Sequence, residues 1–173
     1  IARASVTLLR TDGKHFPLTP DTRLAVITAE ASLGEAIRER VPQAQVMEVP
    51  AYPSSTRRAV LRQRARRLAL GADVVVVGVV NSRQLELVTL AAATGRPVLV
   101  VSMGLPYLAE LADEARAVLA VYSYQPVATE AAAAALFGEI GTPGRLPVGL
   151  SRLAFGHGLD AGASPRWACC APR

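Results

Sequence analysis

Residues able to carry acid–base chemistry are few in this sequence and lie far apart in it. There are two histidines: His15 follows an Asp-Gly turn closely, and His157 stands between two glycines. A single histidine in such a loop is more often a structural hydrogen-bond partner than a catalyst. Most acidic residues fall on expected helix faces, and Glu30 and Glu48, which lie near strand ends, have no visible partner. We therefore predict no assembled active site within this chain.

Motifs that bind cofactors or activate a nucleophile are also missing. The valine-rich run 73–80 is followed by Asn81-Ser82-Arg83 and not by a glycine-rich turn, so a dinucleotide fingerprint does not fit. Segment 141–145 lacks the Lys-Ser/Thr ending of a phosphate-binding loop, and Ser102 lacks the preceding glycine of a nucleophile elbow. The adjacent Cys169-Cys170 pair has neither a C-x-x-C nor a zinc spacing. We predict no cofactor, no metal site and two free thiols.

Polar and aromatic residues instead follow three of the apolar runs, at the point where each run ends. Open α/β sheets bind ligands at the carboxyl ends of their strands, so these residues form a candidate rim for a ligand or a partner domain. The alternative is that they cap helices and satisfy the loop backbone. The rim comprises Asn81, Ser82, Arg83, Ser102, Met103, Tyr107, Tyr122, Ser123 and Tyr124.

The elements that would position this rim centre on residues 72–102. Two valine-rich runs, 73–80 and 98–102, flank a helical pattern that ends at Gly95-Arg96-Pro97. Runs without polar alternation are typical of parallel strands covered on both faces, and the intervening helix makes a right-handed βαβ unit. The other expected strands are 24–27, 45–49 and 117–121, and the other expected helices are 33–41, 55–71, 107–113 and 127–137. This alternation predicts an α/β fold: a doubly wound, mostly parallel sheet of five to six strands with helices on both faces, a three-layer α/β/α sandwich.

The two ends of the chain fall outside the alternating pattern. Residues 1–20 are expected to form an arm, with a strand at 5–9 and a turn at 11–14, that lies on the sheet edge or on a helix. Val148–Leu150 is a candidate additional strand. We divide the chain into a domain of residues 1–159 and an irregular tail of residues 160–173. The opening residues resemble neither a signal peptide nor a terminus that begins with the initiator methionine. We therefore expect a piece of a longer protein, whose localisation stays unknown.

Charge is concentrated in one helical segment. The net charge is +5, and six of the 19 basic residues are arginines between Arg57 and Arg67. An apolar stripe that includes Val60 and Leu61 lies opposite most of them, which is typical of a solvated or interdomain helix face. Aromatic residues make up 5% of the chain, too few for base-stacking platforms, and we predict no nucleic-acid partner. No apolar run approaches the roughly 20 residues that span a bilayer, and we predict no membrane partner.

Several segments together resemble a known domain. Ala4–Gly13, followed by Phe16-Pro17-Leu18, is similar to the opening of the C-terminal domain of glycoside hydrolase family 3. Leu105–Leu108 resembles that domain's NPYDL turn, with leucine in place of its asparagine and of its aspartate. The remaining similar segments, in the family's order, are Tyr122-Ser123, Ala135–Glu139, Gly144–Val148 and Gly156–Leu159.

The resemblance implies a function that this segment does not perform alone. Members of the family are retaining glycosidases whose nucleophilic aspartate lies on a separate N-terminal TIM barrel. In β-glucosidase-type members the second domain adds a glutamate acid/base from a loop, whereas here the loop after 73–80 is only Asn81-Ser82-Arg83. This resembles the β-N-acetylglucosaminidase branch, whose barrel supplies its own acid/base. We expect an accessory domain that packs on the barrel and borders carbohydrate at the interface. The alternative is a self-standing module that binds a small ligand or carbohydrate.

Overall fold

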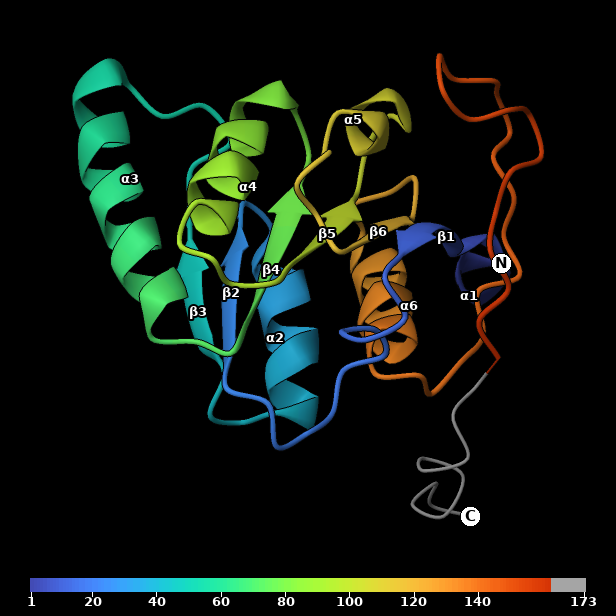
Figure 1. Ribbon diagram of the computed structural model, residues 1–173, viewed down its shortest axis with the longest axis horizontal. Coiled ribbons are helices and arrows are strands. Elements are labelled where there is room, and N and C mark those ends of the chain that lie inside the picture. Colours follow the sequence, from blue (N-terminus) through green and yellow to red (C-terminus); the bar gives the residue numbers. More distant parts are fainter. Residues whose placement is uncertain (163–173) are drawn as a thin grey trace.

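A six-stranded sheet forms the centre of the molecule, for which the computed structural model describes residues 1–162 (Figure 1). The strands are β1 (Thr7–Thr11), β2 (Leu24–Thr28), β3 (Gln45–Glu48), β4 (Val74–Val79), β5 (Val98–Ser102) and β6 (Ala117–Ala120). Their order across the sheet is β1-β6-β5-β4-β2-β3, and every neighbouring pair is parallel except β1 with β6. The predicted mostly parallel sheet is confirmed. The predictions for Cys169-Cys170 lie outside the described residues.

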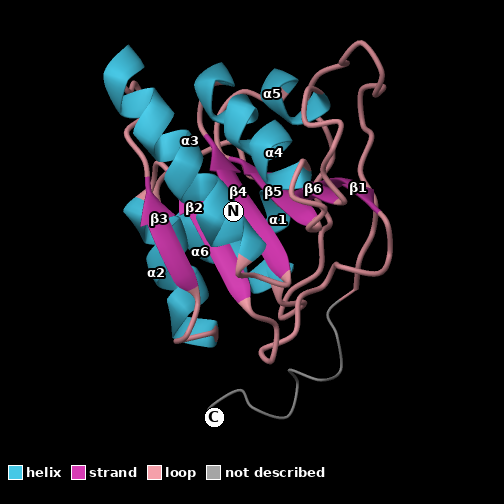
Figure 2. Cartoon of the chain, turned by 60° about the vertical axis from the view of Figure 1, so that its left-hand side comes forward, coloured by secondary structure: helices cyan, strands magenta, loops and turns pink. Residues whose placement is uncertain are grey.

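Helices cover both faces of the sheet and make three layers (Figure 2). The helices are α1 (Ala2–Ser5), α2 (Ala31–Arg40), α3 (Ser55–Leu70), the 3-10 turn η1 (Ser82–Gln84), α4 (Leu85–Ala92), α5 (Tyr107–Glu110) and α6 (Pro126–Leu136). α2 and α6 pack on one face, and α3, α4 and α5 pack on the other. The predicted three-layer α/β/α sandwich is confirmed.

The valines of β4 show why the central strands carry no polar alternation. Val76 joins the core under α2 and α6, whereas Val75 joins the core under α3 and α4, and both are fully buried. A strand covered on both faces needs an apolar side chain at every position. Gly78 is the exception, because a Cβ there would lie 2.6 Å from Thr28 Oγ1 and 2.8 Å from Met103 Cε. The close packing at this point admits no side chain.

Capping residues mark the ends of α3 and α6. Ser54 caps α3, and its hydroxyl accepts a hydrogen bond from the Arg57 amide at 3.4 Å. Gly71 follows the last residue of α3. Pro126 is the first residue of α6, where its missing amide hydrogen costs nothing, and Gly138 follows that helix with a φ of 70°.

The ends of the chain differ from the sequence prediction. The first strand begins at Thr7 and not at Ser5, because residues 2–5 form α1. Val148–Leu150 forms no strand, so that prediction is wrong. The edge of β1 is instead met by Leu159, whose amide donates to the Leu8 carbonyl at 2.8 Å.

Two helical predictions are also corrected. Val60 was expected in the apolar stripe of α3, yet it is 56% exposed, and the buried positions are Leu61, Ala65 and Ala69. The helix expected at 107–113 ends at Glu110. Asp113 beyond it pairs with the Arg152 guanidinium at 2.9 Å, which ties the later loop to α5.

Candidate functional site

The part of the rim that follows β4 is built as a helix cap. The Asn81 side chain accepts the Arg83 amide at 3.0 Å and donates to the Ala51 carbonyl at 3.1 Å. The Gln84 side-chain oxygen accepts the Asn81 amide at 2.8 Å, and the Gln84 side chain is buried. The two residues form a reciprocal capping box. Sequence reasoning missed Gln84, although a glutamine three positions after an asparagine is the pattern that marks such a box.

Arg83 is the charged residue of this segment and is exposed. Its guanidinium carbon lies 5.6 Å from the centre of the Tyr52 ring, within range of a cation–π contact. Arg58 and Arg62 of α3 line the same small cavity, whose volume of about 20 Å³ has room for roughly one water molecule. Ser82 is exposed beside it. This corner of the rim is therefore basic and shallow.

The part of the rim that follows β5 lies mostly inside the protein. Ser102 and Met103 are both fully buried, and Met103 packs against Gly78. The Ser102 hydroxyl has no hydrogen-bond partner among the described residues. Tyr107, at the start of α5, is 53% exposed. Of these three, Tyr107 alone meets solvent in this chain.

The part of the rim that follows β6 combines a structural tyrosine with an exposed one. Tyr122 adopts a φ of 57°, and its hydroxyl donates to Thr7 Oγ1 at 2.8 Å. Burial raises the pKa of Tyr122 above its ordinary value, and the bond to Thr7 offsets this only in part. The Ser123 hydroxyl accepts the Gln125 amide at 3.2 Å, while Tyr124 is 52% exposed. Tyr122 therefore holds β1 to β6.

Large apolar side chains stand exposed along the carboxyl edge of the sheet. Leu105 and Tyr107 follow β5, and Tyr124 and Val127 follow β6, which is its neighbour in the sheet. Each of the four is more than half exposed. Large apolar side chains gathered in water at one edge of a domain favour an interaction surface over a free one. The exposed rim is better suited to a partner surface than to bond-breaking chemistry.

Several acidic residues in the described part of the chain form ion pairs away from the rim. Asp73 pairs with Arg23 at 2.6 Å, and Asp113 pairs with Arg152. Residues 1–162 contain no group of three or more histidine, cysteine and acidic side chains placed to hold a metal ion. In the same residues no helix has the length and apolar character needed to cross a membrane. None of the nine rim residues is acidic, so the rim itself offers no pair of carboxyl groups for acid–base work.

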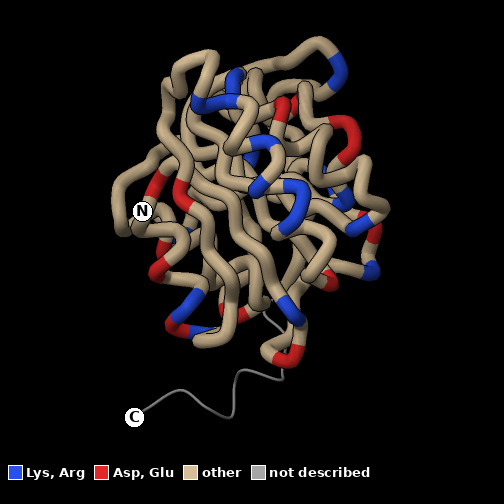
Figure 3. The backbone as a smooth tube through the Cα atoms, turned by 90° about the vertical axis from the view of Figure 1, so that its left-hand side faces the viewer, with Lys and Arg blue, Asp and Glu red and all other residues tan. Residues whose placement is uncertain are grey.

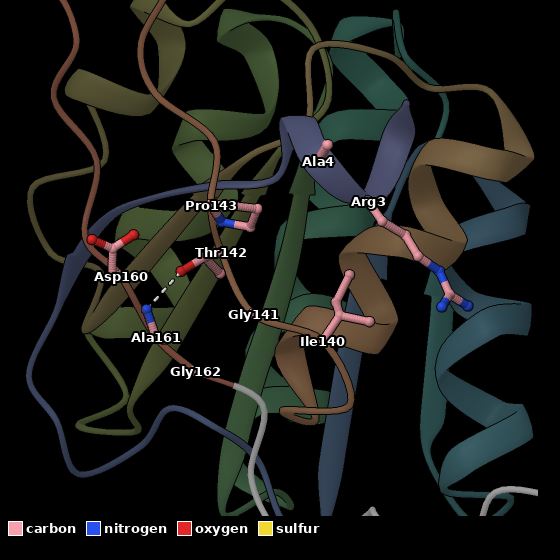
Figure 4. A pocket seen from close by; sticks show the side chains of 9 residues that line it. All are labelled: Arg3, Ala4, Ile140, Gly141, Thr142, Pro143, Asp160, Ala161 and Gly162. Carbon is pink, nitrogen blue, oxygen red and sulfur yellow. Dashed lines mark hydrogen bonds between the residues drawn. The ribbon is translucent and has the colours of Figure 1, made fainter.

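A larger cavity lies away from the rim, between α1 and the segments that follow α6 (Figure 4). It has a volume of about 470 Å³ and is bordered by Arg3 and Asp160, which lie on opposite sides of it. The Asp160 carboxylate is held by Arg145 through two bonds of 2.6 and 2.7 Å. The Thr142 hydroxyl accepts the Ala161 amide and donates to a backbone carbonyl, so it is satisfied. The side chains of Asp160 and Thr142 are therefore already engaged within the protein.

The sequence matches one family model, the glycosyl hydrolase family 3 C-terminal domain, over residues 6–155. The chain belongs to this family. The matched range includes the segments Leu105–Leu108, Tyr122-Ser123, Ala135–Glu139 and Gly144–Val148 singled out in the sequence, whereas Gly156–Leu159 lies just beyond it. No curated protein matches the sequence.

Solved glycosidases share the fold of this family 3 domain. A family 3 β-N-acetylglucosaminidase from Paenibacillus sp. str. FPU-7 is 22% identical, with a TM-score of 0.70 over 83% of this chain. A β-glucosidase from Listeria innocua is 16% identical, with a TM-score of 0.71 over 82%. A β-glucosidase from Erythrobacter marinus is 18% identical, with a TM-score of 0.72 over 92%. This chain spans 30%, 25% and 34% of those three chains, respectively.

Proposed function

We propose that this chain is the C-terminal accessory domain of a retaining glycosidase of the β-N-acetylhexosaminidase type. It packs on an N-terminal TIM barrel of the same parent protein and supports the active site there. Family membership and the small share of each solved glycosidase that the chain spans support this role. The observation that carries it is that the rim of this family 3 domain lacks the two carboxyl groups, about 5 Å apart, that retaining hydrolysis requires.

The exposed edge after β5 and β6 is the surface proposed to meet the barrel. Leu105, Tyr107 and Tyr124 would be removed from water there, which favours association. Ser102 and Met103 would then act by holding the loop from beneath, since both are buried. Carbohydrate would lie at the border between the two domains, where Tyr107 and Tyr124 could contact it.

The β-N-acetylhexosaminidase assignment depends on the length of one connection. β4 ends at Val79 and η1 begins at Ser82, so there is no insertion after β4 that could carry a glutamate to another domain. Glu86, the nearest acid in the following helix, is paired with Arg62 at 3.1 Å. A parent of this type would need its acid/base from its own barrel.

A self-standing binding module is the alternative, and a roomy cavity at the rim would favour it. The cavity beside Arg83 has a volume of about 20 Å³, which is too small to enclose a sugar ring, although it does not limit what lies across the open surface above it. The exposed apolar edge favours a partner domain over a free small ligand.

The test is a hydrolysis assay with a chromogenic β-N-acetylglucosaminide and a matching β-glucoside. We expect the parent protein to cleave the β-N-acetylglucosaminide in preference to the β-glucoside. We expect this chain alone to cleave neither substrate. Activity of the purified chain would contradict the accessory role. Preference of the parent for the glucoside would contradict the assigned substrate while leaving the accessory role in place.

Variants of the parent test the edge itself. The double variant L105D/Y124D should lower kcat/KM of the parent protein at least about tenfold. The reason is that a charge buried in an apolar interface costs on the order of 2 kcal/mol. The control is Val60→Asp, which places an aspartate at a similarly exposed apolar position on α3, away from the edge. If the control loses as much activity as the edge variant, the edge is not the contact surface.

A further inference from the structure

Helix α3 is the most strongly charged element of the described structure. It carries six arginines and no acidic residue over Ser55–Leu70. All six arginines are exposed, and a salt bridge is found for Arg62 alone among them in residues 1–162. Figure 3 turns this side of the molecule toward the viewer and shows basic positions gathered along it. Such a face carries positive charge that the rest of the described chain leaves largely uncompensated.

The arginines of α3 fall into two rows on either side of its buried stripe. Arg58, Arg62 and Arg66 are spaced four residues apart, so they follow one another along one side with a rise of about 6 Å each. The other row is formed by Arg57, Arg64 and Arg67. The two rows carry the same number of charges, which makes each a control for the other.

The first row faces a groove between α3 and α4, and a second element adds to it. Arg58, Arg62 and Arg83 line the same cavity, with Arg83 supplied by η1 in front of α4. Pro53 and Leu87 belong to the apolar lining of this cavity. The cavity is thus lined by guanidinium groups from two elements and by apolar side chains. Guanidinium groups suit planar anions such as carboxylates, which they bind through paired N–H donors.

The groove carries an excess of positive charge. Glu86 is the one acid that lines the cavity, against three arginines. Arg58 also lies in the first turn of α3, where no acid is present and the helix dipole is positive. Neighbouring like charges along a helix destabilise it. A bound anion would relieve both effects.

We propose that the groove lined by Arg58, Arg62 and Arg83, and extended by Arg66 one turn further along the same row of α3, binds an anionic glycan, a saccharide chain that carries carboxylate or phosphate groups. The row length suits a chain with several charges, and the exposed Tyr52 ring under Arg83 adds a surface on which a sugar ring packs. The choice of a glycan rests on membership of a glycosidase family, whereas the binding of an anion rests on the arginines alone. Single-stranded nucleic acid is less favoured, because the groove offers one aromatic ring for stacking.

The experiment measures binding of this chain to a uronic-acid oligosaccharide, a neutral oligosaccharide of equal length and single-stranded DNA. We expect binding to the uronate that weakens as salt rises, and none to the neutral sugar. The variant R58Q/R66Q/R83Q should weaken uronate binding at least about tenfold. The matched control R57Q/R64Q/R67Q removes the same charge from the other row and should change it by no more than about twofold. Circular dichroism verifies that both variants fold.

Each contrary result overturns the proposal in a distinct way. Equal losses in the two variants would mean that net charge, and not the groove, attracts the anion. Tighter binding of DNA than of the uronate would assign the face to nucleic acid. No binding of either would leave α3 as a solvated surface. None of these outcomes bears on the accessory role, because the measurement requires no glycosidase activity.

Discussion

Replacement of Arg40 by methionine should destabilise this domain more than any surface substitution. Arg40 ends α2, and its guanidinium bonds to Glu130 of α6 at 2.7 and 3.1 Å and to Glu139 after α6 at 2.6 and 2.7 Å. It also donates to the Ala36 carbonyl. Burial lowers the pKa of Arg40, but the two carboxylates outweigh that and hold it above its ordinary value. One side chain thus fastens the two helices of the same face.

The magnitude follows from how exposed the three side chains are. Arg40 is 10% exposed, Glu139 is 24% and Glu130 is 41%. Removing one partner of a fully buried pair costs roughly 3–5 kcal/mol, because the other charge stays buried alone. Since water still reaches Glu130, we expect Arg40→Met to lower the free energy of unfolding by about 2–3 kcal/mol. In a domain of this size that lowers Tm by roughly 4–12 °C.

Urea denaturation followed by circular dichroism measures the change. The matched variant R40M/E130Q/E139Q removes all three charges, and we expect it to recover at least half of the loss, because no carboxylate is then left unpaired. A cost below about 1 kcal/mol for the single variant would refute the reasoning. So would a triple variant that is no more stable than the single one.

Two further predictions concern packing and pH. Gly78→Ala places a methyl group 2.8 Å from Met103 and 2.9 Å from Leu33, so the free energy of unfolding should fall by about 1–3 kcal/mol, measured by thermal denaturation. An unchanged Tm would mean that the neighbouring side chains move to make room for the methyl group. Burial alone would raise the pKa of Asp12, but its bond to His15 and two backbone amides lower it to about 2 from 3.8. The lowered pKa contributes stability that is fully present above pH 3.8 and is lost as the pH falls toward 2. Asp12→Asn should therefore flatten the pH dependence of the urea midpoint between about pH 2 and 4, and an unchanged pH dependence there would contradict the prediction.

Ser102 illustrates how a position on the chain differs from a position in space. Its place at the end of β5 made it a candidate rim residue, and the strand does end at Ser102. The side chain is nevertheless fully buried. The strand end depends on local sequence, whereas burial depends on which segments cover it. The Tyr122 bond to Thr7 is likewise invisible in the sequence, because the two residues are 115 positions apart.

Local signals in the sequence determined the elements of this protein. The valine runs predicted β4 and β5, the helical pattern at 55–71 predicted α3, and the alternation of strands and helices predicted the three layers. These signals can be read from the sequence because periodicity and turn chemistry act within a few residues. Tertiary structure decided the rest: the antiparallel edge strand β1, the junction of Arg40 with two distant glutamates, and the meeting of Arg83 with Arg58. These arise from contacts between segments far apart in the chain, which depend on how the layers pack and leave no periodic trace in the sequence.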